Sequence, residues 1–148
     1  MLLVPFDGSA LSTAALERAR EFASFMDEQV VVLSVVPDDP EFARERGWVV
    51  GDEELDVEAI ADQLREEATT VAPDAEFRVE HPTEASMSAT PTMDVVRTIR
   101  EVAAEVRASI VFVGSENAGR VSTPVTSVGD PVAEDPRYDV HIVRHVGE

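Results

Sequence analysis

The sequence predicts an α/β protein in which a parallel sheet of five strands lies between two layers of helices, a three-layer α/β/α sandwich. Two observations support this fold class. Short apolar runs rich in Val, Ile and Leu alternate along the 148 residues with segments whose apolar positions follow helical spacing. The longest of these runs have almost no polar interruption, which is typical of strands buried on both faces. Strands that alternate with helices form parallel sheets through right-handed crossovers.

The first strand and the first helix adjoin at the start of the chain. Residues 2–6 (LLVPF) are apolar, and they are followed by Asp7-Gly8-Ser9. Helical spacing begins at once, and either Ser9 or Ser12 is available as the N-cap. The apolar positions of this helix are Leu11, Ala15, Ala19, Phe22, Ala23 and Met26. A carboxylate and a helix N-terminus are therefore expected at the carboxyl end of the first strand, where open α/β sheets bind ligands.

The next elements continue the alternation. Residues 29–36 (QVVVLSVV) form a second buried strand, and residues 37–53 form a long acidic connection that contains Trp48 between Gly47 and Val49. A second helix carries an apolar stripe at Leu55, Val57, Ile60, Ala61, Leu64, Ala68 and Val71. Residues 75–81 (AEFRVEH) alternate between apolar and charged side chains, which predicts a strand at the edge of the sheet.

The remaining residues complete a single domain over residues 1–148. Residues 82–92 are a loop rich in Pro, Ser and Thr, and residues 109–113 are a buried strand that ends in Gly114-Ser115. The third helix between them has apolar residues at Val95, Val96, Ile99, Val102, Ala103 and Val106. A polar stretch with an irregular helix extends to about residue 138, and residues 139–145 (DVHIVRH) form the last strand.

The charge of the chain is strongly negative. Thirty Asp and Glu residues face twelve basic residues, all of them Arg, for a formal net charge of −18. An acidic surface without Lys indicates adaptation to high salt, where self-repulsion is screened within about 3 Å at 1 M ionic strength. An ordinary acidic protein is the simpler interpretation, but it does not explain the absence of Lys. We therefore expect a halophilic source.

Composition also excludes several function classes. No basic patch is present to bind nucleic acid or an anionic membrane. Without Lys there is no phosphate-loop lysine and no Schiff base, and without Cys there is no disulfide or thiolate site. No secretion signal and no apolar run of about 18 residues is present, so we expect a cytoplasmic protein. His81, His141 and His145 are too scattered to predict a metal site.

Over essentially its whole length the sequence resembles the universal stress protein family. The resemblance is carried by residues 2–23, by the second strand (VVVLSVVP) and by residues 109–115 (SIVFVGS). It implies a Rossmann-like dimer that pairs through the last strand and binds ATP or AMP, with Mg²⁺ accompanying the nucleotide. The implied nucleotide-binding residues are Pro5, Phe6, Asp7, Val35, Gly114, Asn117, Ser127 and Val128.

The sequence departs from the family's glycine signature after the fourth strand. Gly114 fills the first glycine position, whereas Asn117 stands at the second, and the third is Thr126 or Ser127 depending on the alignment register. Glycine lets successive backbone N–H groups approach phosphate oxygens, so its loss predicts a weakened site. Arg120 is the cation of this loop, and Pro124, Pro131 and Pro136 interrupt the helix that should follow.

Each implied residue also has a purely structural interpretation. Asp7 would cap the first helix and shape its turn, Val35 would be core, and Gly114 would end a strand. The expected function is a non-enzymatic stress-response protein with a weakened adenine-nucleotide cleft. The alternative is a dimeric interaction module that has lost nucleotide binding. An enzyme ranks last, because phosphoryl transfer needs a cationic clamp that the sequence offers only through Arg120 and a metal ion on Asp7.

Overall fold

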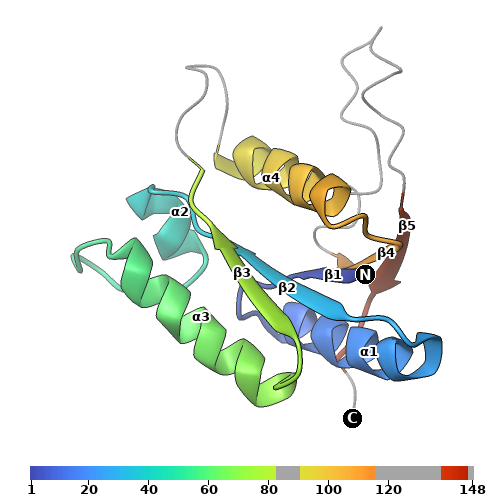
Figure 1. The fold of residues 1–148 in the computed structure, drawn as a ribbon. Coiled ribbons are helices and arrows are strands. Elements are labelled where there is room, and N and C mark those ends of the chain that lie inside the picture. Colours follow the sequence, from blue (N-terminus) through green and yellow to red (C-terminus); the bar gives the residue numbers. More distant parts are fainter. Residues whose placement is uncertain (83–90, 116–137, 147–148) are drawn as a thin grey trace, which may run out of the picture.

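The computed structural model describes residues 1–82, 91–115 and 138–146 of the chain. The strands are β1 (Leu2–Pro5), β2 (Val30–Val35), β3 (Glu76–Glu80), β4 (Ile110–Gly114) and β5 (Asp139–Val143). The helices are α1 (Ala10–Met26), α2 (Pro40–Glu45), α3 (Val57–Val71) and α4 (Pro91–Glu105). Strands and helices alternate along the chain, as the sequence predicts (Figure 1).

The five strands form one parallel sheet in the order β3-β2-β1-β4-β5. Leu3 of β1 pairs with Val31 on one side and Val111 on the other, so β1 lies at the centre. Helices α1 and α3 cover one face of the sheet and α4 covers the other (Figure 1). The predicted fold class, with a five-stranded parallel sheet between helical layers, is confirmed.

Strand β2 shows why a continuous apolar run predicts a central strand. All of its residues are buried. Val30 and Val32 join the cluster under α1 and α3, whereas Val31, Leu33 and Val35 join the cluster under α4. Because successive side chains point to opposite faces, a strand between two helical layers needs apolar residues at every position.

Strand β3 lies at an edge of the sheet, as its alternating sequence predicts. Phe77 and Val79 pack against the cluster under α1 and α3. Arg78 points to the other face, where its guanidinium lies 3.2 Å from Glu80 Oε2 and 2.5 Å from Glu105 Oε2. The outermost strand on this side therefore has an apolar face toward the core and a face of paired charges.

Helix α2 is a correction to the sequence analysis, which predicted only an acidic connection over residues 37–53. Residues Pro40–Glu45 form a helix of six residues. Asp39 is the N-cap, and its carboxylate accepts a hydrogen bond from the N–H of Phe42 at 3.0 Å. The pair Asp39-Pro40 is a recognised helix start, because Pro fits the first turn where no N–H partner is needed. The signal was therefore present in the sequence.

Strand β5 ends at Val143, two residues earlier than the sequence pattern predicts, so His145 lies beyond the sheet. Its His141 packs into an aromatic cluster, with the ring stacked on Phe112 at a centroid distance of 5.0 Å and edge-on to Phe22 at 5.1 Å. Burial, together with the charge of Arg18, lowers the pKa of His141 below its ordinary value. This histidine therefore packs as a neutral ring.

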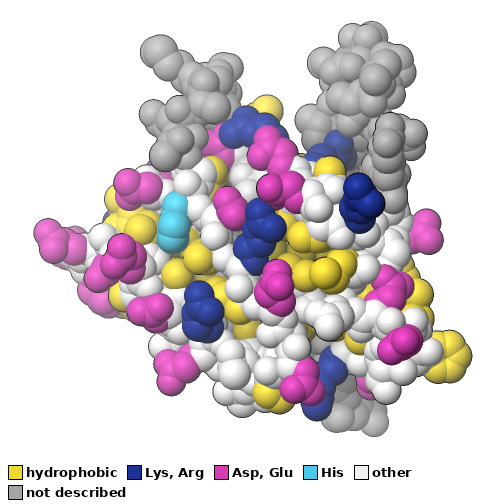
Figure 2. Space-filling view, in the orientation of Figure 1, with side chains coloured by type: hydrophobic (Ala, Val, Ile, Leu, Met, Phe, Trp, Pro, Cys, Tyr) yellow, Lys and Arg dark blue, Asp and Glu magenta, His cyan; other side chains and the backbone are white. Residues whose placement is uncertain are grey.

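The surface reflects the composition. Figure 2 shows acidic side chains spread over the visible face rather than gathered in one patch. Of the helices in the described part of the chain, none has the length and apolar character needed to cross a membrane.

Candidate functional site

The end of β1 positions the candidate site. Phe6 continues the sheet beyond Pro5, since its N–H donates to the carbonyl of Leu33 at 2.8 Å, and its carbonyl accepts the Ser34 hydroxyl at 2.7 Å. Asp7 is thereby the first residue past the sheet edge, with its side chain 19% exposed. The following Gly8 has φ +85°, and a Cβ there would lie 3.1 Å from Glu67 Oε1 of α3. Helix α3 therefore approaches the turn closely, and glycine permits both features.

Helix α1 is capped by Ser9, one of the two predicted candidates. Its hydroxyl accepts a hydrogen bond from the N–H of Ser12 at 3.2 Å. The interpretation of Asp7 as the cap was wrong, although its role in the turn is confirmed. Asp7 Oδ1 accepts from the N–H of Ser9 at 2.9 Å, which closes an Asx-type turn two residues before the helix.

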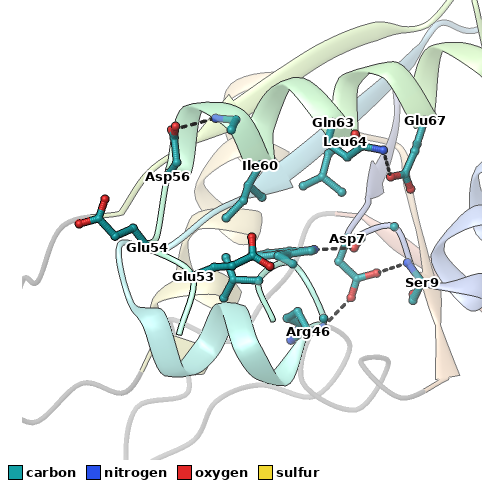
Figure 3. A pocket seen from close by; sticks show the side chains of 15 residues that line it. Asp7, Ser9, Arg46, Glu53, Glu54, Asp56, Ile60, Gln63, Leu64 and Glu67 are labelled. Atoms are coloured by element: carbon teal, nitrogen blue, oxygen red, sulfur yellow. Dashed lines mark hydrogen bonds and ion pairs between the residues drawn. The ribbon is translucent and has the colours of Figure 1, made fainter. Parts of the chain in front are cut away.

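Two side chains from the segment after α2 contact Asp7 (Figure 3). Arg46 Nη1 lies 2.6 Å from Asp7 Oδ2, and the indole N–H of Trp48 donates to the Asp7 carbonyl at 3.0 Å. From the sequence, Trp48 is known only as part of the acidic connection, and Arg46 is not singled out. No local signal separates Arg46 from Arg44. The two are two positions apart at the end of a helix, where such residues point in different directions.

These contacts determine the ionisation of Asp7. Burial raises the pKa of its carboxyl, but the hydrogen bonds from Ser9 and Ser12 and the charge of Arg46 together outweigh burial. The net pKa is below its ordinary value of 3.8. Asp7 is therefore an anion near neutral pH, held in a fixed orientation by its neighbours.

A pocket of about 560 Å³ opens beside Asp7, between the turn, the segment after α2 and helix α3 (Figure 3). This volume is in the range of small-molecule sites. Ile60 and Leu64 supply apolar surface from α3, and Trp48 supplies an aromatic ring. The acidic residues of the lining are Asp7, Glu53, Glu54, Asp56 and Glu67. Arg46 is the basic residue of the lining, and its charge is already paired with Asp7.

The structure brings some of the predicted residues to one edge. Strands β1 and β4 run parallel and side by side, so Pro5, Phe6, Asp7 and Gly114 all lie at the same carboxyl edge of the sheet. Of the predicted residues that the structure describes, Asp7 is the one that lines the pocket. Val35 packs in the cluster under α4, as its structural interpretation predicts. Asn117, Ser127 and Val128 lie outside the described residues. Nucleotide contact by these residues stays a prediction.

Gly114 has a structural reason of its own. A Cβ at this position would lie only 2.8 Å from the Cβ of Leu11 on α1. Carbon atoms in contact are normally about 3.5–4.0 Å apart, so any larger residue would push the helix away from β4. Close packing between α1 and β4 therefore accounts for the glycine independently of any ligand.

The described residues around Asp7 do not form a metal centre. Within residues 1–82, 91–115 and 138–146, no three His, Cys, Asp or Glu side chains are grouped so that they could hold a metal ion. The acidic residues of the pocket are already engaged in part. Asp56 caps α3 through the N–H of Ala59 at 3.0 Å, and Glu67 accepts from Gln63 at 2.9 Å.

Comparison with known proteins identifies the relatives of this chain. The universal stress protein family matches residues 1–144. A universal stress protein crystallised in complex with cAMP is 25% identical, with a TM-score of 0.55 and coverage of 99% of this chain and 97% of its own. A family member from Burkholderia pseudomallei is 20% identical, with a TM-score of 0.57 and coverage of 97% and 95%. UspA from Lactobacillus plantarum is 19% identical, with a TM-score of 0.53 and coverage of 97% and 96%. Among curated proteins no match was found.

Proposed function

The chain belongs to the universal stress protein family, and from this membership we propose that it is a non-enzymatic, cytoplasmic stress-response protein that binds an adenine nucleotide weakly. The binding site would be the cleft at the carboxyl ends of β1 and β4. Asp7 would anchor the nucleoside, and Mg²⁺ would accompany the phosphates. The observation that carries the proposal is the position of Asp7, which directly follows β1 at this edge of the sheet and whose carboxylate Ser9 and Arg46 hold in place.

The nature of the ligand is supported by a relative. The 25% identical universal stress protein was crystallised with cAMP, which is an adenine nucleotide. Both chains are covered almost completely in that comparison, so the sheet edge that bears Asp7 has a counterpart in the relative. Ligands of open α/β sheets bind at this edge, where neighbouring strands end.

The weakness of binding follows from charge. Asp7 also lines the pocket next to this cleft, whose lining holds five carboxylates and an arginine that is paired with one of them. Phosphate groups are repelled by such a surface, and the net charge of −18 adds to the repulsion at low salt. The same composition argues against turnover, because phosphoryl transfer depends on cations aimed at the developing negative charge.

Calorimetry tests the proposal. Titration of AMP and ATP in 1 M KCl, a salt concentration that suits the proposed halophilic source, should give dissociation constants of about 0.1–1 mM, equivalent to about 4–5.5 kcal/mol. Asp7→Asn keeps the shape of the side chain and removes its charge, and it should weaken AMP binding by about tenfold or more. Phosphate release from ATP should not exceed the buffer blank.

Two results would reject this function. Absence of heat and of a thermal shift with both nucleotides would favour the alternative of an interaction module without nucleotide. Equal AMP affinity of the wild type and Asp7→Asn would remove Asp7 from the site. The matched control is Asp74→Asn, at an exposed carboxylate in the turn between α3 and β3, which should leave AMP affinity unchanged.

The proposal includes a homodimer formed through β5. Among the residues that the structure describes, this strand is at the edge of the sheet and pairs with β4 alone. Its half-buried residues Val140 and Ile142 extend the apolar cluster under α4 to that edge. Light scattering in 1 M KCl should therefore give twice the single-chain mass of 16.1 kDa. A mass of one chain across the accessible concentration range would contradict pairing.

A further inference from the structure

The segment of residues 46–50, which follows α2, donates two side-chain hydrogen bonds to Asp7. Arg46 donates to the carboxylate at 2.6 Å, and the Trp48 indole donates to the main-chain carbonyl at 3.0 Å. Both contacts join residues about forty positions apart in the sequence. They are tertiary contacts that the turn at Asp7 does not need, because Ser9 already fixes its geometry.

The segment is held to α2 as a unit. The Arg46 guanidinium lies 4.7 Å above the centroid of the Phe42 ring, and the ring of Trp48 lies 5.7 Å from the same ring. The N–H of Trp48 donates to the carbonyl of Ala43 at 2.9 Å. Arg46, Trp48 and Phe42 therefore form one layered cluster. If Arg46 moved, the packing of Trp48 on Phe42 would change as well.

Two glycines lie in and directly after the segment. Gly47 and Gly51 have φ values of +76° and +61°, and neither has another atom within 4 Å of an added Cβ. The backbone thus changes direction at both glycines in open space. The Arg46 side chain is 23% exposed, so water and salt ions reach the ion pair from the pocket. An ion pair at such a border exchanges partners at a lower cost than a fully buried pair.

We propose that the 46–50 segment is an internal competitor for the nucleotide cleft: Arg46 and Trp48 occupy Asp7 in the free protein, and a ligand that uses Asp7 binds by displacing them. This inference rests on the proposed function and adds its regulation. The observed affinity is then the intrinsic affinity reduced by the fraction of molecules in which Asp7 is free. Ligand binding is coupled to movement of the segment where a ligand group takes the place of the Arg46 guanidinium on Asp7 Oδ2, because the ion pair is then broken.

Removing the competitor should tighten binding. Arg46→Gln shortens the side chain and removes its charge, and it should lower the AMP dissociation constant by about tenfold, equivalent to about 1.4 kcal/mol. Arg44→Gln is the matched control. It changes the net charge equally and lies two residues before Arg46, in the last turn of α2, but Arg44 is exposed and does not line the pocket. It should leave AMP affinity within about twofold of the wild type.

Trp48 provides a second readout, because it is the only tryptophan in the chain. Addition of AMP to the wild type should shift its emission and increase its quenching by acrylamide. Arg46→Gln should show increased quenching before any nucleotide is added, whereas Arg44→Gln should not. Trp48→Phe retains the ring packing and removes the indole N–H donor, so AMP should bind this variant several-fold more tightly than the wild type. This variant decides the matter if Arg46→Gln does not fold.

The outcomes separate the two proposals. If the wild type binds AMP, and both Arg46→Gln and Trp48→Phe bind it equally well or more weakly, the competitor is rejected and the nucleotide function stands. The competitor is also rejected if the emission and the acrylamide quenching of Trp48 do not change while AMP saturates the wild type. If neither the wild type nor any variant binds AMP or ATP, both proposals fail. Tightening confined to Arg46→Gln and Trp48→Phe, with a Trp48 response in the wild type, supports the competitor.

Discussion

Replacing Phe112 with alanine should lower the free energy of unfolding by about 3–5 kcal/mol, the largest effect that we expect from a single substitution in this protein. Phe112 is 0% exposed and lies in β4, next to the central strand. Its ring contacts Phe22 of α1 at a centroid distance of 5.3 Å and His141 of β5 at 5.0 Å. Alanine would leave a cavity between two elements that cannot close it without shifting the sheet.

Phe25→Ala is the matched control, because it makes the same chemical change at a residue that is 90% exposed. It should alter stability by no more than about 0.5 kcal/mol. Urea unfolding of both variants in 1 M KCl measures the difference. A loss below about 1 kcal/mol for Phe112→Ala would contradict close packing of Phe112 with Phe22 and His141.

Gly114→Ala should cost about 1–3 kcal/mol, although it adds a single methyl group. The new Cβ would lie 2.8 Å from the Cβ of Leu11, so α1 or β4 has to move. Both elements are anchored elsewhere in the core, by Leu16 and Ala19 in α1 and by Phe112 in β4. The strain should therefore appear as lost stability, measured by urea unfolding, rather than as a local adjustment.

A double-mutant cycle with Leu11 shows whether this contact is the cause. Leu11→Ala keeps the Cβ and should leave the cost of Gly114→Ala almost unchanged. Leu11→Gly removes the Cβ, so in that background the cost should fall by about 1 kcal/mol or more. Equal costs of Gly114→Ala in both backgrounds would show that Leu11 is not what excludes the methyl group.

Most of the fold could be predicted from the sequence, because the patterns that indicate strands and helices are local. The unbroken apolar run of β2 predicts burial on both faces, and the alternation of β3 predicts an edge with one apolar face. Helix α2 was missed because a helix of six residues has too few apolar positions to show a period. Its Asp39-Pro40 start was the available signal.

The site was accessible only in part. The sequence predicts Asp7 at the edge of the sheet, because the residue directly follows a strand. It does not predict the partners of Asp7, since Arg46 and Trp48 come from a connection whose path depends on the packing of Phe42. The sequence also does not predict that α3 lines the pocket, because the polar side chains of Gln63 and Glu67 have the pattern of an ordinary solvated helix face.

The two outer strands of the sheet differ in a way that limits how the protein can associate. Strand β3 carries Arg78 tied to Glu80 and Glu105, and a further strand added there would have to break or bury these charges. If copies pair through β5, each copy has one edge strand that can pair, β5, and one that cannot, β3. Growth would then stop at a closed pair, and the sheet would not extend into a filament even at high concentration.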